Sequence, residues 1–263
     1  MRLKKALVVY THPAYGIYKS TLDKVKEILR KYRIGYNLAD RDKLKYEQFQ
    51  KRDLIIAVGG DGTFLRAAQF VSNQLMLGVN ADVSTKEGFF MSSDKNNFEA
   101  VIDRILKNEI NIKKFPRLEA RIDNKKIATP SLNEFFIGPK KAYHAAKYII
   151  EIGGRKERQK SSGVLVTTPA GSYAWARACN TKPMNLNTKN FQFVVREPYE
   201  GKVFRNYKLK KGILKPSQKV SIESEMLDGV IVADSVGKEF AFKNGGKAVI
   251  KLSRNYVNLI VKR

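Results

Sequence analysis

One acid set among glycines, in the segment Gly59-Gly60-Asp61-Gly62-Thr63, has the clearest potential for chemistry in this sequence. Glycine lets a backbone approach a bulky anion closely and adopt dihedral angles that other residues avoid. A helix that begins just after such a turn directs its N–H groups and its positive dipole end at the anion. A carboxylate repels phosphate, so an aspartate is useful here if it holds a metal ion or accepts a proton. A phosphate cradle combined with an acid therefore indicates phosphoryl transfer.

Two other interpretations of this turn fit less well. A strand-to-helix connection can use glycine for tightness alone, but three glycines around an acid exceed that need. The dinucleotide-binding fingerprint would require a further glycine where Leu65 stands, and the sequence contains no Gly-x-x-x-x-Gly-Lys-Ser/Thr loop. We therefore interpret the turn as functional.

The elements around the turn predict an α/β domain. Apolar runs predict strands near residues 4–10, 34–38, 54–58 and 75–79, and apolar positions at helical spacing predict helices near 19–32, 63–73 and 98–105. This alternation is typical of a Rossmann-like parallel sheet with helical crossovers, here over residues 1–107. The active crevice of such a sheet lies beyond the carboxyl ends of its strands, which is where the glycine turn falls.

The pattern changes after residue 107. Short alternating segments separated by turn residues, such as Gly153-Gly154 and Gly245-Gly246, dominate the rest of the chain. One helical start, near residues 172–178, interrupts them. We expect a second, mostly β domain over residues 108–263.

The β region has an amide and a carboxylate side by side, Asn133-Glu134, at the head of a very apolar strand. Burying them without partners would cost several kcal/mol. A carboxylate can accept both hydroxyls of a vicinal diol, and an amide can donate and accept at once, so a ribose suits the pair. The alternative is an exposed strand entrance after Pro130.

Two further polar features lie in the same region. Residues 161–175 form a strand, a Pro/Gly turn rich in hydroxyls and a helix start carrying Tyr173 and Trp175. Small residues leave room for a ligand and an aromatic ring can stack on a base, although a packed turn with core aromatics is the alternative. Asp234 is an acid that closes a predicted strand.

Composition limits the class of protein. With 263 residues and 43% hydrophobic content, the chain can build two cores. Apolar runs of about five residues are far short of the roughly 18 that span a membrane, so no membrane partner is expected. The single cysteine, Cys179, permits no internal disulfide and favours a reducing cytoplasm.

The net charge of +25 attracts anions. Nucleic acid is one candidate and small polyphosphate ligands are another, and a general compositional bias is a third explanation. The basic residues are spread along the whole chain, and no nucleic-acid-binding motif is recognisable.

Taken in order, the polar segments resemble the motifs of the NAD kinase family. Residues 59–63 are similar to its GGDGT motif, Asn133-Glu134 to its Asn-Glu motif, and residues 168–175 to its TPTGSTAY segment. Asp234, followed by Gly245-Gly246, resembles its late Asp-Gly element. Diacylglycerol kinases, sphingosine kinases and phosphofructokinases share the first motif, whereas the second and third single out NAD kinases.

The sequence also departs from the family pattern. Ser162-Gly163 stands where the family has an acid-Gly pair, and Trp175 replaces a tyrosine. The family's Asn-x-Gly-x-x-Gly-Phe segment is only partly echoed, from Asn80 to Gly88-Phe89. Ser162-Gly163, Trp175 and the stretch Arg196-Glu197-Pro198 look closer to the divergent branch of the family that includes the animal mitochondrial enzyme.

The resemblance implies transfer of the γ-phosphoryl group of ATP, or of polyphosphate, to the 2′-hydroxyl of the adenosine ribose of NAD or NADH. Asp61 would accept or orient the hydroxyl proton and touch Mg²⁺, while the glycines and Thr63 would hold phosphates. Asn133 and Glu134 would fix the ribose. The resemblance further implies a homodimer or homotetramer. The other residues that it assigns to NAD binding are Ser162, Thr168, Ser172, Tyr173, Ala174 and Asp234.

Two rival functions remain at this point. A lipid kinase of the same superfamily would share residues 59–63 but has no use for Asn133-Glu134. A basic nucleic-acid-binding protein that keeps the kinase fold without its activity would bind DNA or RNA with an affinity that falls steeply with salt. Retention of Asp61 argues against the second, because an acid in a glycine turn does nothing for binding phosphodiesters.

Overall fold

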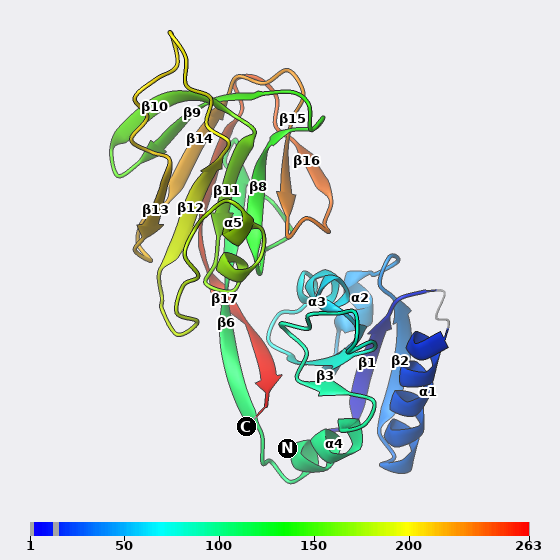
Figure 1. Ribbon diagram of the computed structural model, residues 1–263. Coiled ribbons are helices and arrows are strands. Elements are labelled where there is room, and N and C mark those ends of the chain that lie inside the picture. The colour runs from blue at the N-terminus through cyan, green and yellow to red at the C-terminus, as the bar shows by residue number, and fades with distance from the viewer. Residues whose placement is uncertain (1–2, 13–15, 263) are drawn as a thin grey trace. The chain divides into compact units, whose positions relative to one another are not determined.

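The computed structural model describes residues 3–12 and 16–262, which form two compact units. The first unit contains the described residues up to Phe115 together with those from Tyr256 onward, and the second is Pro116–Asn255 (Figure 1). The predicted order, an α/β region followed by a mostly β region, is confirmed. The observed division differs from a boundary at residue 107, because the C-terminal residues pair with a strand of the first unit.

The first unit is built on a parallel sheet in the order β2-β1-β3-β4. Beyond β4 lie the short β5 and the last residues of β17, both parallel to β4. Pairs such as Val8↔Ile56 and Ile56↔Leu77 fix the register of the central strands. These strands are β1 (Lys5–Tyr10), β2 (Gly35–Asp40), β3 (Leu54–Gly59), β4 (Leu75–Asn80), β5 (Ser93–Asp94) and β17 (Lys247–Val261).

Two helices complete the main core of this unit. Val25 and Ile28 from α1 (Gly16–Lys31) and Ile102 from α4 (Phe98–Leu106) pack in one buried cluster with Val8 and Ile56 of the sheet. The apolar spacing that predicted these helices therefore places one stripe of each against the strands. The other helices of the unit are α2 (Tyr46–Phe49) and α3 (Asp61–Ala68).

The strand order determines which connections meet at the carboxyl edge of the sheet. Because β2, β1, β3 and β4 are parallel neighbours, the residues that follow them lie along one edge. Arg41 follows β2, Thr11 follows β1, the turn of residues 60–63 follows β3, and Ala81 follows β4.

The second unit has two sheets that share one core. One sheet runs β10-β9-β14-β17, with β6 and β7 joined through β17, and the other runs β13-β12-β11-β8-β15-β16. Buried side chains from both, including Ile150, Ile222, Phe135 and Val166, form a single cluster. This arrangement is a β-sandwich.

The bounds of the elements in this unit are as follows. The first sheet contains β6 (Asn111–Ile122), β7 (Lys125–Lys126), β9 (Ala146–Ile152), β10 (Arg155–Ser161) and β14 (Val220–Ser224). The second contains β8 (Glu134–Pro139), β11 (Gly163–Thr167), β12 (Phe191–Arg196), β13 (Lys211–Leu214), β15 (Gly229–Ala233) and β16 (Glu239–Ala241). The short helices η1 (Gly171–Tyr173) and α5 (Trp175–Ala178) follow β11.

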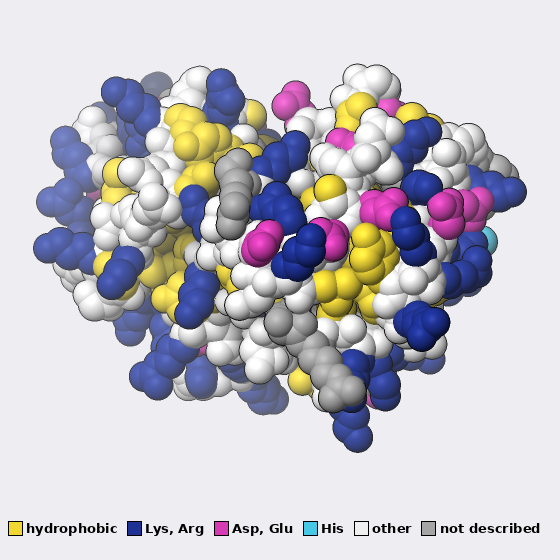
Figure 2. All heavy atoms as spheres, turned by 90° about the horizontal axis from the view of Figure 1, so that it is seen from below, with side chains coloured by type: hydrophobic (Ala, Val, Ile, Leu, Met, Phe, Trp, Pro, Cys, Tyr) yellow, Lys and Arg dark blue, Asp and Glu magenta, His cyan; other side chains and the backbone are white. Residues whose placement is uncertain are grey.

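The surface carries many basic side chains. Figure 2 shows Lys and Arg scattered over the face in view, with Asp, Glu and apolar side chains between them, and no single basic stripe. Among the described residues, no helix has both the length and the apolar character needed to cross a membrane.

Candidate functional site

The glycine turn joins β3 to α3 at the carboxyl edge of the parallel sheet. Gly60 is extended (φ −127°, ψ −172°) and precedes the first helical residue, Asp61. Its carbonyl accepts the N–H groups of Thr63 (2.9 Å) and Phe64 (3.2 Å), and no side chain caps the helix. The amino end of α3 is therefore available to an anion.

The glycines of the turn have different surroundings. A Cβ added at Gly59 would lie 2.5 Å from Thr63 Oγ1, so this glycine is required by packing. A Cβ at Gly60 would lie 3.3 Å from Cδ of Lys86. A Cβ at Gly62 would meet no heavy atom within 4 Å, so this residue borders open space at the start of the helix.

Asp61 is half-exposed and its carboxylate is held in place by a neighbouring loop. Oδ2 accepts the N–H of Phe89 at 3.0 Å, and Oδ1 accepts the N–H of Phe90 at 2.9 Å. Gly88, with a left-handed φ of 69°, forms the bend before these two amides. The acid thus has a fixed orientation before any ligand binds.

Thr63 is fully buried. Its Oγ1 lies 3.2 Å from Oγ1 of Thr11 and accepts a hydrogen bond from Nη1 of Arg41 at 3.1 Å. The hydroxyl predicted to hold phosphate is thus engaged within the turn, and Arg41 is the basic group that it positions.

In the β unit, Asp234 organises the segment that contains the Asn-Glu pair. Its fully buried carboxylate accepts hydrogen bonds from Ser131 Oγ (2.7 Å), the N–H of Leu132 (2.9 Å) and the N–H of Asn133 (2.6 Å). Its own N–H donates to the carbonyl of Glu134 at 2.9 Å. The backbone of residues 131–134 is therefore fixed by this one acid.

Asn133 and Glu134 each have a polar atom without a protein partner. Both side chains are buried, with exposed fractions of 8% and 3%. Oδ1 of Asn133 and Oε2 of Glu134 have no hydrogen-bond partner among the described residues. Buried polar atoms are nearly always paired, so these two acceptors indicate a ligand that supplies hydroxyl or amide donors.

The two carboxyls of this cluster have raised pKa values. Burial, together with the nearby charge of Asp234, raises the pKa of Glu134 to about 8. Burial raises the pKa of Asp234 to about 6, even though its hydrogen bonds act in the opposite direction. Glu134 therefore takes up a proton more readily than an ordinary glutamate, and its protonated form can both donate and accept.

These shifts predict how stability depends on pH. A carboxyl whose pKa is raised in the folded state contributes most stability below its unfolded value of 4.5, and that contribution is lost as pH rises toward about 8. For Glu134 we expect a loss of about 3 kcal/mol between pH 5 and pH 9, measured by urea unfolding. Glu134→Gln should remove most of this slope.

The control for this prediction is Glu223→Gln, which removes a half-exposed carboxylate that pairs with Lys247. It should leave the pH slope unchanged. If wild type and Glu134→Gln lose stability equally between pH 5 and pH 9, the buried carboxyl is not the source of the slope.

Thr168 and Ser172 are buried and bonded to the backbone. Thr168 Oγ1 donates to the carbonyl of Leu132 at 2.6 Å, which ties it to the Asn-Glu segment. Ser172 Oγ donates to the carbonyl of Pro169 at 2.6 Å and accepts the N–H of Met184 at 2.8 Å. Both hydroxyls hold the turn in shape.

Tyr173 and Ala174 are the more accessible members of this predicted set. Tyr173 is 39% exposed and Ala174 is half-buried, and both lie between β11 and α5. The structure therefore brings Asn133, Glu134 and Asp234 together with the turn that follows β11.

The structure does not bring Ser162 to this cluster. Ser162 precedes β11 and Thr168 follows it, so a whole strand separates them. Its hydroxyl donates to Glu197 instead. Trp175 stacks on Phe136 with ring centroids 5.2 Å apart, and the guanidinium of Arg196 lies 4.5 Å from its ring.

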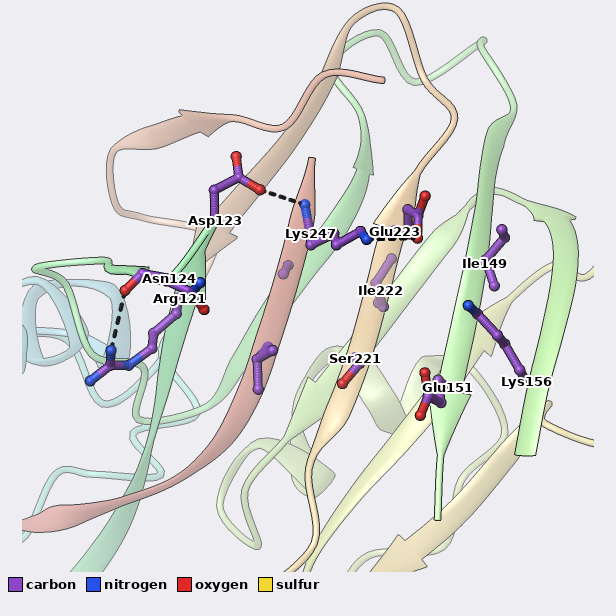
Figure 3. Close-up of a pocket in the computed structure, with 12 residues that line it drawn as sticks. Arg121, Asp123, Asn124, Ile149, Glu151, Lys156, Ser221, Ile222, Glu223 and Lys247 are labelled. Atoms are coloured by element: carbon purple, nitrogen blue, oxygen red, sulfur yellow. Dashed lines mark hydrogen bonds and ion pairs between the residues drawn. The ribbon is translucent and has the colours of Figure 1, made fainter. Parts of the chain in front are cut away.

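A cavity of about 440 Å³ lies elsewhere on the β unit, along β14 and the first half of β17 (Figure 3). It contains none of the predicted site residues. Some of its polar groups bond to one another: Lys247 pairs with Glu223 and donates its N–H to Asp123. We assign this cavity no ligand.

The sequence is similar to known proteins that are described as kinases of NAD or NADH. Residues 8–110 match the family described as the ATP-NAD kinase N-terminal domain. The chain is 24% identical over 208 residues to a probable NADH kinase of Oryza sativa subsp. japonica, a match covering 69% of this chain and 62% of the rice protein. It is 32% identical over 126 residues to a bifunctional NADP phosphatase/NAD kinase of Methanocaldococcus jannaschii, covering 46% of this chain and 22% of that protein. The chain thus spans less than two thirds of the length of these relatives.

Solved structures share the fold along nearly the whole chain. An NAD kinase from Archaeoglobus fulgidus in complex with ATP has a TM-score of 0.78 at 21% identity, covering 97% of this chain and 92% of that one. Yeast NADH kinase complexed with NADH has a TM-score of 0.83 at 16% identity, covering 99% and 84%. The chain therefore shares the fold of these NAD and NADH kinases, and residues 8–110 match the ATP-NAD kinase N-terminal domain family.

NAD kinases use ATP with a divalent cation. The glycine turn offers such an ion one carboxylate, that of Asp61. Mg²⁺ is usually held by one or two carboxylates together with substrate phosphates and water. Asp61 offers one such carboxylate beside the amino end of α3. No group of three or more His, Cys, Asp or Glu within the described residues forms a protein-only metal site. Asp61 would therefore share the ion with the phosphates.

The open space beside Gly62 leads to a prediction for this glycine turn. Gly62→Ala places a methyl group where no protein atom lies, and alanine favours a helix, so we expect stability to rise by about 0.5 kcal/mol. The same methyl group occupies the space next to the anion site, so affinity for ATP should fall several-fold. Urea unfolding and titration calorimetry measure the two effects.

Gly59→Ala provides the contrast. Its Cβ would clash with Thr63, so stability should fall by about 1–3 kcal/mol. Unchanged ATP affinity in Gly62→Ala would mean that phosphates do not approach the open side of the turn.

Sequence reasoning missed three contributors to the site. The amides of Phe89 and Phe90 orient Asp61, and Arg41 lies against Thr63. The partial match from Asn80 to Gly88-Phe89 was the available signal for the first two. No local pattern marked Arg41.

Proposed function

We propose that this protein is an NAD kinase, a phosphotransferase that moves the γ-phosphoryl group of ATP or polyphosphate to the 2′-hydroxyl of the adenosine ribose of NAD or NADH. The observation that carries the proposal is the buried pair of acceptors, Asn133 Oδ1 and Glu134 Oε2, that have no protein partner. The two vicinal hydroxyls of a nucleotide ribose can satisfy both acceptors, whereas diacylglycerol offers a single hydroxyl on an otherwise apolar molecule.

The phosphoryl donor would bind at the glycine turn. Backbone N–H groups at the start of α3 hold the phosphates, and Mg²⁺, when bound with Asp61, supplies neutralisation of their charge. The carboxylate of Asp61 accepts the proton of the 2′-hydroxyl as that oxygen bonds to the γ-phosphorus. The bond from the γ-phosphorus to the bridging oxygen breaks, and ADP or a shortened polyphosphate leaves.

The acceptor would bind through the β unit. Asn133 and Glu134 bond ribose hydroxyls, and Asp234 keeps their backbone in place. Tyr173 and Ala174 line the adenine pocket, whose turn is shaped by Thr168 and Ser172. Ser162 remains an NAD-binding prediction.

The proposal also covers the oligomeric state and the cellular compartment of the protein. We expect a homodimer or homotetramer, which light scattering of the purified chain measures directly. We also expect a cytoplasmic setting, because a single free cysteine, Cys179, forms no internal disulfide.

The test is an assay of four donor–acceptor pairs: ATP or polyphosphate with NAD⁺ or NADH, each with Mg²⁺. Formation of NADP or NADPH from at least one pair, lost when Mg²⁺ is chelated, is the expected result. Diacylglycerol and sphingosine serve as competing acceptors, and a salt titration of DNA and RNA binding tests the non-enzymatic alternative. Failure of all four pairs would overturn the proposal, and turnover of a lipid would then favour the lipid-kinase alternative.

A further inference from the structure

Arg41 lies at the glycine turn although it is distant from it in sequence. It follows β2 directly, and its N–H donates to the carbonyl of Tyr10 at the end of β1 (2.9 Å). Its Nη1 donates to Oγ1 of the buried Thr63 (3.1 Å). Backbone and side chain are thus anchored on two neighbouring connections of the parallel sheet.

The guanidinium keeps hydrogen-bonding capacity after this contact. Arginine has five N–H donors, and the bond to Thr63 uses one of them. Nε of Arg41 is buried and has no hydrogen-bond partner among the described residues, and Oδ2 of Asp42 lies 3.6 Å from it, in ion-pair range. Asp42 is also shared with Arg66, at 3.5 Å.

A second basic residue approaches the turn from the opposite side. Lys86 belongs to the connection that follows β4, and its aliphatic chain lies against Gly60. Asn80 Nδ2 donates to the Lys86 carbonyl at 3.3 Å, which holds this connection near the end of β4. In the order β2-β1-β3-β4, Arg41 and Lys86 therefore flank the turn that follows β3.

The charge of the donor explains why such groups are needed. ATP and polyphosphate are polyanions, and Asp61 adds a negative charge at the point where they would bind. Backbone amides carry only partial charges. A planar guanidinium matches two phosphate oxygens at once and is always charged, whereas lysine supplies a point charge.

We propose that Arg41 is a positioning residue for the phosphoryl donor, bonding the terminal phosphates through a guanidinium that Thr63 holds in place, with Lys86 on the opposite side. This inference rests on the proposed kinase function and names the residues that would select a polyphosphate chain. The ligand class is a linear triphosphate or longer polyphosphate, with or without a nucleoside.

Arg41→Gln and Arg41→Lys test the proposal. With ATP as donor, Arg41→Gln should raise the KM for ATP by at least tenfold and change the KM for NAD by less than twofold. Inorganic tripolyphosphate, used as a competitive inhibitor, should lose affinity by the same factor. The KM for ATP of Arg41→Lys should fall between those of wild type and Arg41→Gln, because lysine keeps the positive charge but lacks the planar pair of N–H donors that binds two phosphate oxygens.

The matched control is Arg30→Gln, which removes one positive charge from the exposed face of α1. It should leave both KM values unchanged. Thermal unfolding confirms that each variant is folded. Equal increases in the two KM values, or an unchanged inhibition constant for tripolyphosphate, would overturn the role of Arg41.

The design separates this inference from the proposed function. If wild type forms no NADP, the kinase assignment fails, but calorimetric binding of tripolyphosphate to wild type and Arg41→Gln still tests the phosphate site. If wild type is active and Arg41→Gln binds tripolyphosphate equally well, only the inference about Arg41 fails.

Discussion

Asp61→Asn is expected to lower kcat for NADP formation by about a thousandfold or more. The carboxylate is the one acid at the amino end of α3, and an amide can neither accept the 2′-hydroxyl proton nor hold Mg²⁺ as strongly. Asparagine keeps the shape of the side chain, and its oxygen can still accept one of the N–H groups of Phe89 and Phe90. The fold should therefore persist, and kcat is measured by initial rates at saturating substrates.

The control for this substitution is Asp82→Asn. Asp82 lies in the connection after the neighbouring strand β4, and its exposed carboxylate bonds the hydroxyls of Ser84 (2.6 Å) and Thr85 (2.5 Å). We expect its kcat to stay within a few-fold of wild type. Asp61→Asn with more than a tenth of wild-type kcat would contradict the role given to Asp61 as a proton acceptor.

Local sequence patterns predicted the fold class because they report local periodicity. The apolar run before Gly59 and the helical spacing after it set β3 and α3 regardless of their partners. The pairing of Asn258 with Leu75 is different, because it depends on which strand the end of the chain meets. A domain boundary based on local sequence patterns therefore assigned the residues from Tyr256 onward to the β region, whereas the structure places them in the first unit.

The same distinction explains the composition of the site. Gly62 and Asp61 were recognisable because three glycines around an acid exceed what a tight strand-to-helix turn needs. Arg41 became part of the site only through the strand order β2-β1-β3, which no local pattern reveals. Contacts of this kind depend on long-range topology.

Hydroxyl residues were the least predictable part. Thr63, Thr168 and Ser172 were all expected at the ligand, yet each uses its hydroxyl within the protein frame. Short polar side chains at turns readily bond nearby backbone groups, so their type does not reveal which way they face. The unpaired atoms of Asn133 and Glu134 are more informative, because burial without a partner is unfavourable.

Asp234→Ala should reduce the free energy of unfolding by about 4 kcal/mol. The substitution leaves the hydroxyl of Ser131 and the N–H groups of Leu132 and Asn133 buried without an acceptor. It also places alanine at a left-handed φ of 56°, and this backbone strain accounts for about 1 kcal/mol of the total. Urea unfolding at pH 7 measures the loss.

Asp234→Asn separates these two causes, because asparagine tolerates the left-handed backbone and keeps one acceptor oxygen. We expect it to lose about 1–2 kcal/mol. Without the charge at position 234, the pKa of Glu134 should fall toward its ordinary value, and stability should decline less steeply between pH 6 and pH 9. Asp228→Asn, at an exposed turn of the same unit, should change neither quantity. An Asp234→Ala protein as stable as Asp228→Asn would show that the Asn-Glu segment keeps its conformation without the buried carboxylate.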